Sequence, residues 1–168
     1  TSLMGIVVEP VTMGIISTKF KSEGALLITH WGMSGPATLK LSAHAARYLH
    51  EQNYRVNVAI NWVNESNANI VEEHIANIIQ RNPKKHIAGI APYQLTNRMW
   101  QYLLERADID GTKRWDELGR KALNKLIETL TNDIHATQGK GRFKDEFVTC
   151  GGISLQSINS STLESKVC

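Results

Sequence analysis

The chain has 168 residues, of which 42% are apolar and 21% charged, and this balance is typical of a globular domain and excludes a disordered or fibrous chain. The net charge of +3 comes from 19 basic and 16 acidic residues spread along the sequence, so nucleic acid is not expected as a partner. No apolar run is long enough for a membrane span, and no signal peptide is visible. Because the two cysteines also form no recognised motif, we expect a cytoplasmic protein without a membrane partner.

Three runs of apolar and β-branched residues near the start of the chain predict strands. Pro10 and the polar residues 21–24 are expected to break the β structure between these runs, because proline cannot donate a ladder hydrogen bond and polar clusters favour turns. The predicted strands are residues 6–8, 11–18 and 25–29.

A glycine-rich turn from Thr29 to Pro36 follows these strands. Gly32 and Gly35 permit backbone angles that other residues avoid, and Pro36 suits the first turn of a helix. Ser34 is the expected N-cap of that helix. Because the first N–H groups of a helix have no partner within it, this turn is a candidate contact for an anion or a cofactor.

A helix is predicted at about residues 36–51, and a strand with alternating apolar residues follows at 56–61. The β signals return after a long helical block. Further strands are predicted at residues 134–137, 146–150 and 153–158.

Residues 63–133 carry only helical signals, in three amphipathic stripes. Asn69 and Glu72 have the spacing of a capping pair at the start of the first helix, and Trp115 begins the apolar side of the third. About seventy residues in three such helices are enough to form a small lobe of their own.

These patterns together predict an α+β fold with two subdomains. Residues 1–62 and 134–168 would form a small antiparallel β-barrel built from both ends of the chain, with one helix at about residues 36–51. An all-α helical lobe, residues 63–133, would interrupt the barrel.

No metal site is predicted. Cys150 and Cys168 form neither a C-x-x-C motif nor a zinc-ligand spacing. His44 and His50 lack the i, i+4 spacing of a helical metal pair.

Three residues of chemically reactive types, Ser34, His30 and Cys150, could each have a catalytic role or only a structural one. Gly32-Met33-Ser34 matches part of the G-x-S-x-G elbow of serine hydrolases, but the second glycine follows the serine directly and no Asp and His partners stand out. His30 lies in the glycine-rich turn, where an acid–base role would need a partner that the sequence does not identify. Cys150 would likewise need a base to act as a nucleophile.

Two glycine-rich motifs near the two ends of the chain carry a resemblance to a known family. The first is THWGMSGPA at residues 29–37, and the second is EFVTCGGI at residues 146–153, followed by STLESK at residues 161–166. In this order they resemble the aminoacetone oxidase-like (BaiN-type) family of bacterial FAD-dependent flavoproteins, within the NAD(P)/FAD-dependent oxidoreductase class. In that family an insert made of a β-barrel and a helical lobe interrupts the dinucleotide-binding domain. The resemblance implies that this chain is nearly all insert, cut from a longer parent protein.

The resemblance also implies a cofactor and partners. FAD would be the cofactor of the parent, and the insert would cover the flavin, dock on the FAD-binding domain of the same parent chain and shape the pocket for a small-molecule substrate. The G-x-G-x-x-G motif that holds the FAD pyrophosphate is absent, so this segment alone is expected neither to hold FAD nor to turn over. The implied cofactor contacts are Thr29, His30, Gly32, Ser34, Gly35, Pro36, Thr149, Gly151 and Gly152.

The alternative from another class is a stand-alone β-barrel binding module, with nucleic acid as its ligand. The basic run at residues 140–144 favours this alternative, although a solvated basic hairpin is the commoner explanation of such a run. The diffuse charge of the rest of the chain argues against it.

Overall fold

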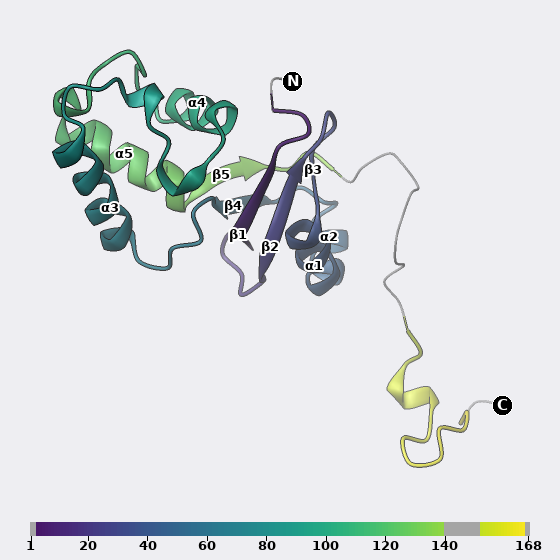
Figure 1. Cartoon of the computed structure of the whole chain (residues 1–168). Helices are drawn as coiled ribbons and strands as arrows, with labels where there is room; N and C mark the ends of the chain where they lie inside the picture. The colour runs from purple at the N-terminus through teal and green to yellow at the C-terminus, as the bar shows by residue number, and fades with distance from the viewer. Residues whose placement is uncertain (1–2, 140–151, 167–168) are drawn as a thin grey trace.

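The computed structural model describes residues 3–139 and 152–166 of the chain. In Figure 1 an antiparallel half-barrel of five strands, in the order β3-β2-β1-β4-β5, stands beside a lobe of helices. The helical lobe is inserted between β4 and β5, so chain segments on both sides of it contribute strands to one sheet. This confirms the predicted α+β class with an interrupted β part, while the predicted subdomain boundaries stay a prediction.

The elements have the following bounds in chain order. The strands are β1 (Val7–Ile15), β2 (Lys21–Ile28), β3 (Met33–Ser34), β4 (Asn57–Asn61) and β5 (Asp133–Ala136). The α-helices are α1 (Pro36–His44), α2 (Ala46–Glu51), α3 (Ala68–Arg81), α4 (Asn97–Arg106) and α5 (Arg120–Thr131). The 3-10 helices are η1 (Ile87–Gly89), η2 (Pro92–Gln94), η3 (Trp115–Glu117) and η4 (Leu155–Ser157). Among the described residues, none of the helices combines the length and apolar character that crossing a membrane requires.

The central strands can be compared directly with the alternating pattern of the sequence. In β4 the side chains of Val58 and Ile60 are buried, as the sequence pattern predicts. In β1 the prediction of a break at Pro10 is wrong, because the strand continues through the proline. A register shift between Val8 and Val11 takes Pro10 out of regular pairing with β2.

The start of β2 corrects a second prediction. Residues 21–24 were expected to form a break, but they pair with β1, and the turn comes earlier, where the N–H of Ile15 donates to the carbonyl of Phe20 at 3.1 Å. The polar Ser22 is tolerated in the strand because its Oγ donates to the carbonyl of Ala37 at 2.7 Å. The sequence pattern did not show that a helix would satisfy this hydroxyl.

The helix predicted at residues 36–51 is two helices that meet at Ala45. Ala45 is completely buried and leaves the helical conformation, with φ −100° and ψ 13°. Ser34 is not the N-cap, contrary to the prediction, because it still pairs with Leu27 as part of β3. Gly35 takes the cap position, without a side-chain hydrogen bond to the helix.

The three predicted helices of the lobe are present, with different starting points. Asn67 caps α3 by accepting the N–H of Asn69 at 2.9 Å, so the predicted capping pair of Asn69 and Glu72 is wrong. Trp115 lies in η3, ahead of α5, and its ring stacks on that of Trp100 with centroids 6.2 Å apart. Trp115 therefore joins η3 to α4 within the lobe instead of belonging to the third helix.

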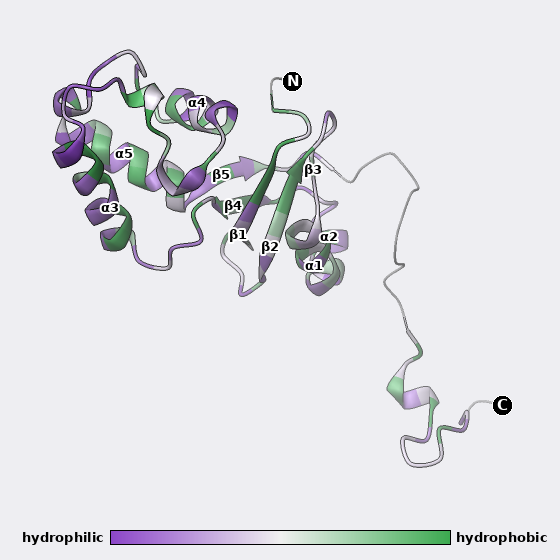
Figure 2. Cartoon of the chain, viewed as in Figure 1, coloured by the Kyte–Doolittle hydropathy of each residue, from purple (hydrophilic) through white to green (hydrophobic). Residues whose placement is uncertain are grey.

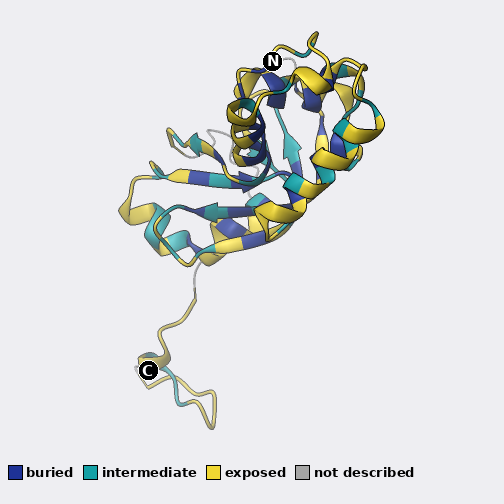
Figure 3. Ribbon diagram, turned by 90° about the vertical axis from the view of Figure 1, so that its left-hand side faces the viewer, coloured by how far each residue is buried: buried dark blue, intermediate teal, exposed yellow. Residues whose placement is uncertain are grey.

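The hydrophobic core runs from the sheet into the lobe. Figure 2 shows apolar residues along β1 and β2, and apolar and polar residues alternating around α3 and α5. Figure 3 shows buried residues both in the sheet and inside the lobe. Fully buried side chains include Leu26 and Ile60 of the sheet and Ile75, Met99 and Leu126 of the lobe.

The described C-terminal segment, residues 152–166, lies apart from the sheet (Figures 1 and 3). The strand predicted at residues 153–158 is wrong, because η4 forms there, capped by the Ser154 side chain, which accepts the N–H of Gln156 at 3.4 Å. Two features predicted from the sequence lie outside the described residues, namely the strand at 146–150 and the basic run at 140–144.

A buried carboxylate ties the lobe to the sheet. Asp133, at the start of β5, is 4% exposed. Its Oδ1 accepts the Nε–H of Arg106 on α4 at 3.1 Å, and its Oδ2 accepts from Trp62 Nε1 at 3.0 Å and from His135 Nε2 at 2.7 Å. Burial alone raises the pKa of Asp133, but these hydrogen bonds and the charge of His135 outweigh it and lower the pKa below its ordinary value.

Replacing Gly35 with alanine should destabilise the fold. Gly35 has φ +93°, and a Cβ there would lie 2.8 Å from the carbonyl oxygen of Ala25. The backbone strain and the clash together should cost about 2 kcal/mol of unfolding free energy or more, measured by urea denaturation. The control is Gly89→Ala, where a Cβ meets nothing within 4 Å and the change should stay within about 0.5 kcal/mol. Equal stability of the two variants would contradict the tight packing of Gly35.

Replacing Asp133 with asparagine should weaken the junction between lobe and sheet. The amide removes the negative charge that faces Arg106, and we expect a loss of about 2 to 4 kcal/mol at neutral pH. The negative charge of Asp133 stabilises the native fold because the native pKa of this carboxyl is lowered. That stabilisation is complete above the unfolded pKa of about 3.9 and is lost as the pH falls through the lower native pKa. The difference between the two proteins should therefore shrink below about pH 4.

The matched control for this change is Glu72→Gln. Glu72 pairs with Arg120 at the surface, where the two side chains are 34% and 69% exposed. The same acid-to-amide replacement should cost under about 1 kcal/mol there. Urea denaturation across the acidic range measures both variants, and an equal, pH-independent loss in the two would refute a special role for Asp133.

Candidate functional site

The predicted cofactor turn is the hairpin between β2 and β3. Three hydrogen bonds between Thr29 and Gly32 close this hairpin. The N–H and the Oγ1 of Thr29 donate to the carbonyl of Gly32 at 2.8 and 2.9 Å. The N–H of Gly32 donates to the Oγ1 of Thr29 at 3.1 Å. The side chains of His30 and Trp31 are exposed at the tip, Trp31 to 49%. The tip therefore carries two exposed rings, while these backbone groups are used within the turn.

The N-terminus of α1 lies against β2. Ala37, in its first turn, is completely buried, and a Cβ on Gly24 of β2 would lie 3.4 Å from the nitrogen of Ala37. Pro36 has no N–H to donate. The buried side of the helix start is therefore closed to a ligand, while Pro36 and the Thr29–Gly32 tip stay accessible.

The second predicted motif is only partly described. Thr149 and Gly151 lie outside the described residues. Gly152 is exposed, and nothing lies within 4 Å of a Cβ placed on it. Because the segment 152–166 lies apart from the sheet, the structure does not bring Gly152 next to the hairpin (Figures 1 and 3). The role of all nine predicted contacts in FAD binding stays a prediction.

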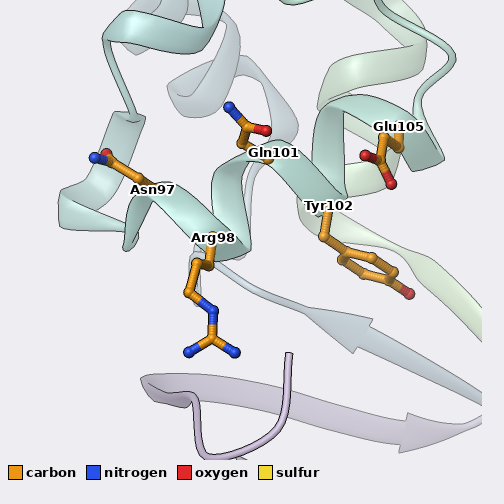
Figure 4. A pocket seen from close by; sticks show the side chains of 5 residues that line it. All are labelled: Asn97, Arg98, Gln101, Tyr102 and Glu105. Carbon is orange, nitrogen blue, oxygen red and sulfur yellow. The ribbon is translucent and has the colours of Figure 1, made fainter. Parts of the chain in front are cut away.

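An open pocket of about 340 Å³ lies along α4, and the sequence analysis did not select its residues. Figure 4 shows Arg98 pointing from α4 toward the N-terminal segment, with Tyr102 one turn further along the helix. Burial raises the pKa of Tyr102, and the negative charge of Asp133 raises it further, so the phenol is protonated and can donate a hydrogen bond at neutral pH. The lining residues are Asn97, Arg98, Gln101, Tyr102 and Glu105.

The N-terminal segment connects this pocket to the hairpin. Arg98 Nη2 donates to the carbonyl of Met4 at 3.3 Å. The N–H of Gly5 donates to the carbonyl of Ile28 at 2.8 Å, and the N–H of Ile28 donates to the carbonyl of Ile6 at 2.9 Å. Residues 4–6 thus lie between α4 on one side and the end of β2 on the other, so the pocket and the hairpin tip form two parts of one region.

The sequence did contain a signal for the pocket. Asn97, Gln101 and Glu105 recur at a spacing of four residues and therefore form one polar side of an amphipathic helix. Such a side is usually solvated, and only the neighbouring N-terminal segment turns it into a pocket.

Among residues 3–139 and 152–166, no three His, Cys, Asp or Glu side chains lie close enough together to hold a metal ion. The groups present in the region are the amides of Asn97 and Gln101, the phenol of Tyr102, the guanidinium of Arg98, the carboxylate of Glu105 and the two exposed rings of the hairpin tip. This set of groups can orient a polar ligand.

Comparison with known proteins places the chain in a family. Residues 1–148 match the family model described as HI0933-like protein barrel and H2TH domain. The ribosomal RNA dihydrouridine synthase of Haemophilus influenzae is 27% identical over 172 aligned residues, which cover 98% of this chain and 38% of that protein. The chain thus spans well under half the length of this curated relative. Because the family model covers most of the chain, the protein belongs to the family of the HI0933-like barrel and H2TH domain.

Proposed function

We propose that this chain is the barrel-and-helix insert of an FAD-dependent oxidoreductase and that it covers the flavin of its parent protein. The contact of residues 4–6 with both α4 and β2 is the observation that carries the proposal, because it joins the predicted cofactor hairpin to the α4 pocket. A substrate in this pocket would lie beside the hairpin tip. The narrower BaiN-type assignment is part of the same proposal.

The described residues suit a cover better than a complete cofactor site. FAD, when bound, supplies two-electron redox chemistry, and the protein supplies orientation and a suitable electrostatic environment. Trp31 and His30 are exposed at the hairpin tip, and the α4 pocket is open. These features can contact a flavin that another domain holds, but the described residues do not enclose one. We therefore expect the segment alone to hold no FAD.

The substrate that we propose is a uridine of ribosomal RNA. The amides of Asn97 and Gln101 can both donate and accept hydrogen bonds, and the ring of Tyr102 can stack on a base, so the pocket suits a planar polar ring. The name of the relative from Haemophilus influenzae describes the formation of dihydrouridine in ribosomal RNA, which is a reaction of such a uridine. This proposal replaces the sequence-based expectation of a small-molecule substrate without nucleic acid.

The second candidate is a nucleic-acid-binding module without a flavin. The name of the same relative is compatible with it, since a module of an RNA-modifying protein can bind RNA without taking part in the chemistry. The flavin content of the parent protein separates the two candidates.

The parent protein, with both flanking regions restored, should be yellow. We expect an oxidised-flavin absorbance spectrum for the parent and none for the 168-residue chain purified under the same conditions. Titrating FAD into the chain should give no saturable change in flavin fluorescence. A parent that stays colourless after reconstitution with FAD would reject the cover proposal and favour the second candidate.

Removing the phenol of Tyr102 should impair turnover in the parent. We expect Tyr102→Phe to lower kcat/KM for ribosomal RNA by roughly three- to tenfold, the effect of losing one hydrogen bond. Turnover is followed as oxidation of the reduced flavin by RNA, with dihydrouridine quantified in the product.

The matched control is Tyr48→Phe, which removes one phenol from a partly buried tyrosine on α2. Its kcat/KM should be unchanged. An equal effect of the two changes, or none from Tyr102→Phe, would remove the pocket from the proposed function without affecting the flavin assignment.

A further inference from the structure

Two turns at one end of the helical lobe are held together by backbone hydrogen bonds. The first, residues 81–86, begins at the last residue of α3, and the second, residues 110–114, precedes η3. The N–H of Ile87 donates to the carbonyl of Lys113 at 2.9 Å, and the N–H of Trp115 donates to the carbonyl of Lys85 at 3.1 Å. We call the two turns together the paired-turn surface. The side chain of His86 in the first turn also contacts the carbonyl of Thr112 in the second. None of the lysine and arginine side chains takes part in these contacts between the turns.

The paired-turn surface gathers positive charge that is dispersed in the sequence. All of its basic side chains are exposed, and in the sequence the two groups are separated by the whole of α4. Figure 1 shows the end of α3 and the adjoining loops at the side of the lobe farthest from the sheet, and Figure 2 colours this end largely hydrophilic. The basic residues are Arg81, Lys84, Lys85, Lys113 and Arg114.

Acidic residues near the turns offset only part of this charge. Asp110 accepts the N–H and the hydroxyl of Thr112 at 2.9 and 2.7 Å, and these hydrogen bonds lower its pKa. Glu117 accepts the N–H of Arg114 at 3.1 Å. Asp116 is the third carboxylate, so five basic side chains stand against three acidic ones, and two of the three acids are hydrogen-bonded to the second turn.

We infer that the paired-turn surface binds the phosphate backbone of RNA, an inference that rests on the proposed function for the identity of the partner. Exposed lysines and arginines on a rigid main-chain frame suit phosphate contacts, which position a nucleic acid without reading its sequence. The α4 pocket would take one base, and the surface at the far end of the lobe would hold the flanking strand. A substrate that reaches both must be a polynucleotide and not a free nucleotide.

The test measures binding of a fluorescein-labelled RNA hairpin to the 168-residue chain by fluorescence anisotropy over a range of salt concentrations. The triple variant Lys84→Ala/Lys85→Ala/Lys113→Ala should bind roughly 10- to 100-fold more weakly at about 0.1 M salt. The magnitude of the slope of log K against log salt should fall by about 2 to 3, since each of the three lost phosphate contacts removes roughly 0.7 to 0.9 from it.

The control variant removes the same charge from exposed positions on the sheet side of the molecule, and its affinity should change less than about threefold. It carries the substitutions Lys19→Ala, Arg47→Ala and Arg55→Ala. A further variant with arginine in place of Lys84, Lys85 and Lys113 keeps the charge and should keep the affinity. Thermal melting of each variant checks that it is folded, and if the alanine triple unfolds, the comparison of Lys113→Ala with Lys19→Ala replaces it.

Equal losses in the two alanine triples would show that only net charge matters and would overturn the inference. Failure of the unaltered chain to bind RNA would overturn it as well. Neither result depends on the flavin, so a yellow parent whose insert binds no RNA would refute the paired-turn surface alone. A colourless parent with an intact, lysine-dependent RNA affinity would instead refute the flavin-cover proposal.

Discussion

The buried carboxylate of Asp133 is the constraint on which the arrangement of lobe and sheet depends. It accepts hydrogen bonds from Arg106 on α4, from Trp62 after β4 and from His135 on β5, so three parts of the chain meet on one side chain. A buried charge is tolerated only when its partners are all present. The lobe can therefore interrupt the β part of the chain and still hold a fixed position against it.

That fixed position creates the candidate site. Because Arg106 fixes the end of α4 at the junction, the polar side of the same helix lies over the N-terminal segment, where Arg98 meets Met4. The segment in turn pairs with the end of β2 at Ile28. The pocket and the hairpin tip flank the N-terminal segment, and the paired-turn surface lies on the same lobe as the pocket. This arrangement suits the proposed cover, which must place a long substrate over a cofactor held by another domain.

Local patterns predicted most of the elements, and long-range contacts explain the errors. The alternation in β4 was sufficient to predict that strand, and the apolar stripes were sufficient to predict the three lobe helices. Each of these patterns depends on residues that are close in sequence. Ser34 was misassigned as a cap because its pairing with β2 is not a local signal, and the pocket was missed because the segment that faces α4 lies more than ninety residues away in the sequence. The paired-turn surface was missed for the same reason, since its two basic groups are brought together by hydrogen bonds between turns that are far apart in the sequence.

Hydrogen–deuterium exchange on the parent protein, with and without FAD, tests the central claim most directly, because it reports which amides the cofactor domain and the flavin protect. If the hairpin and α4 face the flavin, FAD should slow exchange at residues 29–36 and 97–105 and leave the paired-turn surface unchanged. Protection confined to the turns at 81–86 and 110–114, or no protection anywhere in the insert, would show that this chain does not cover the cofactor.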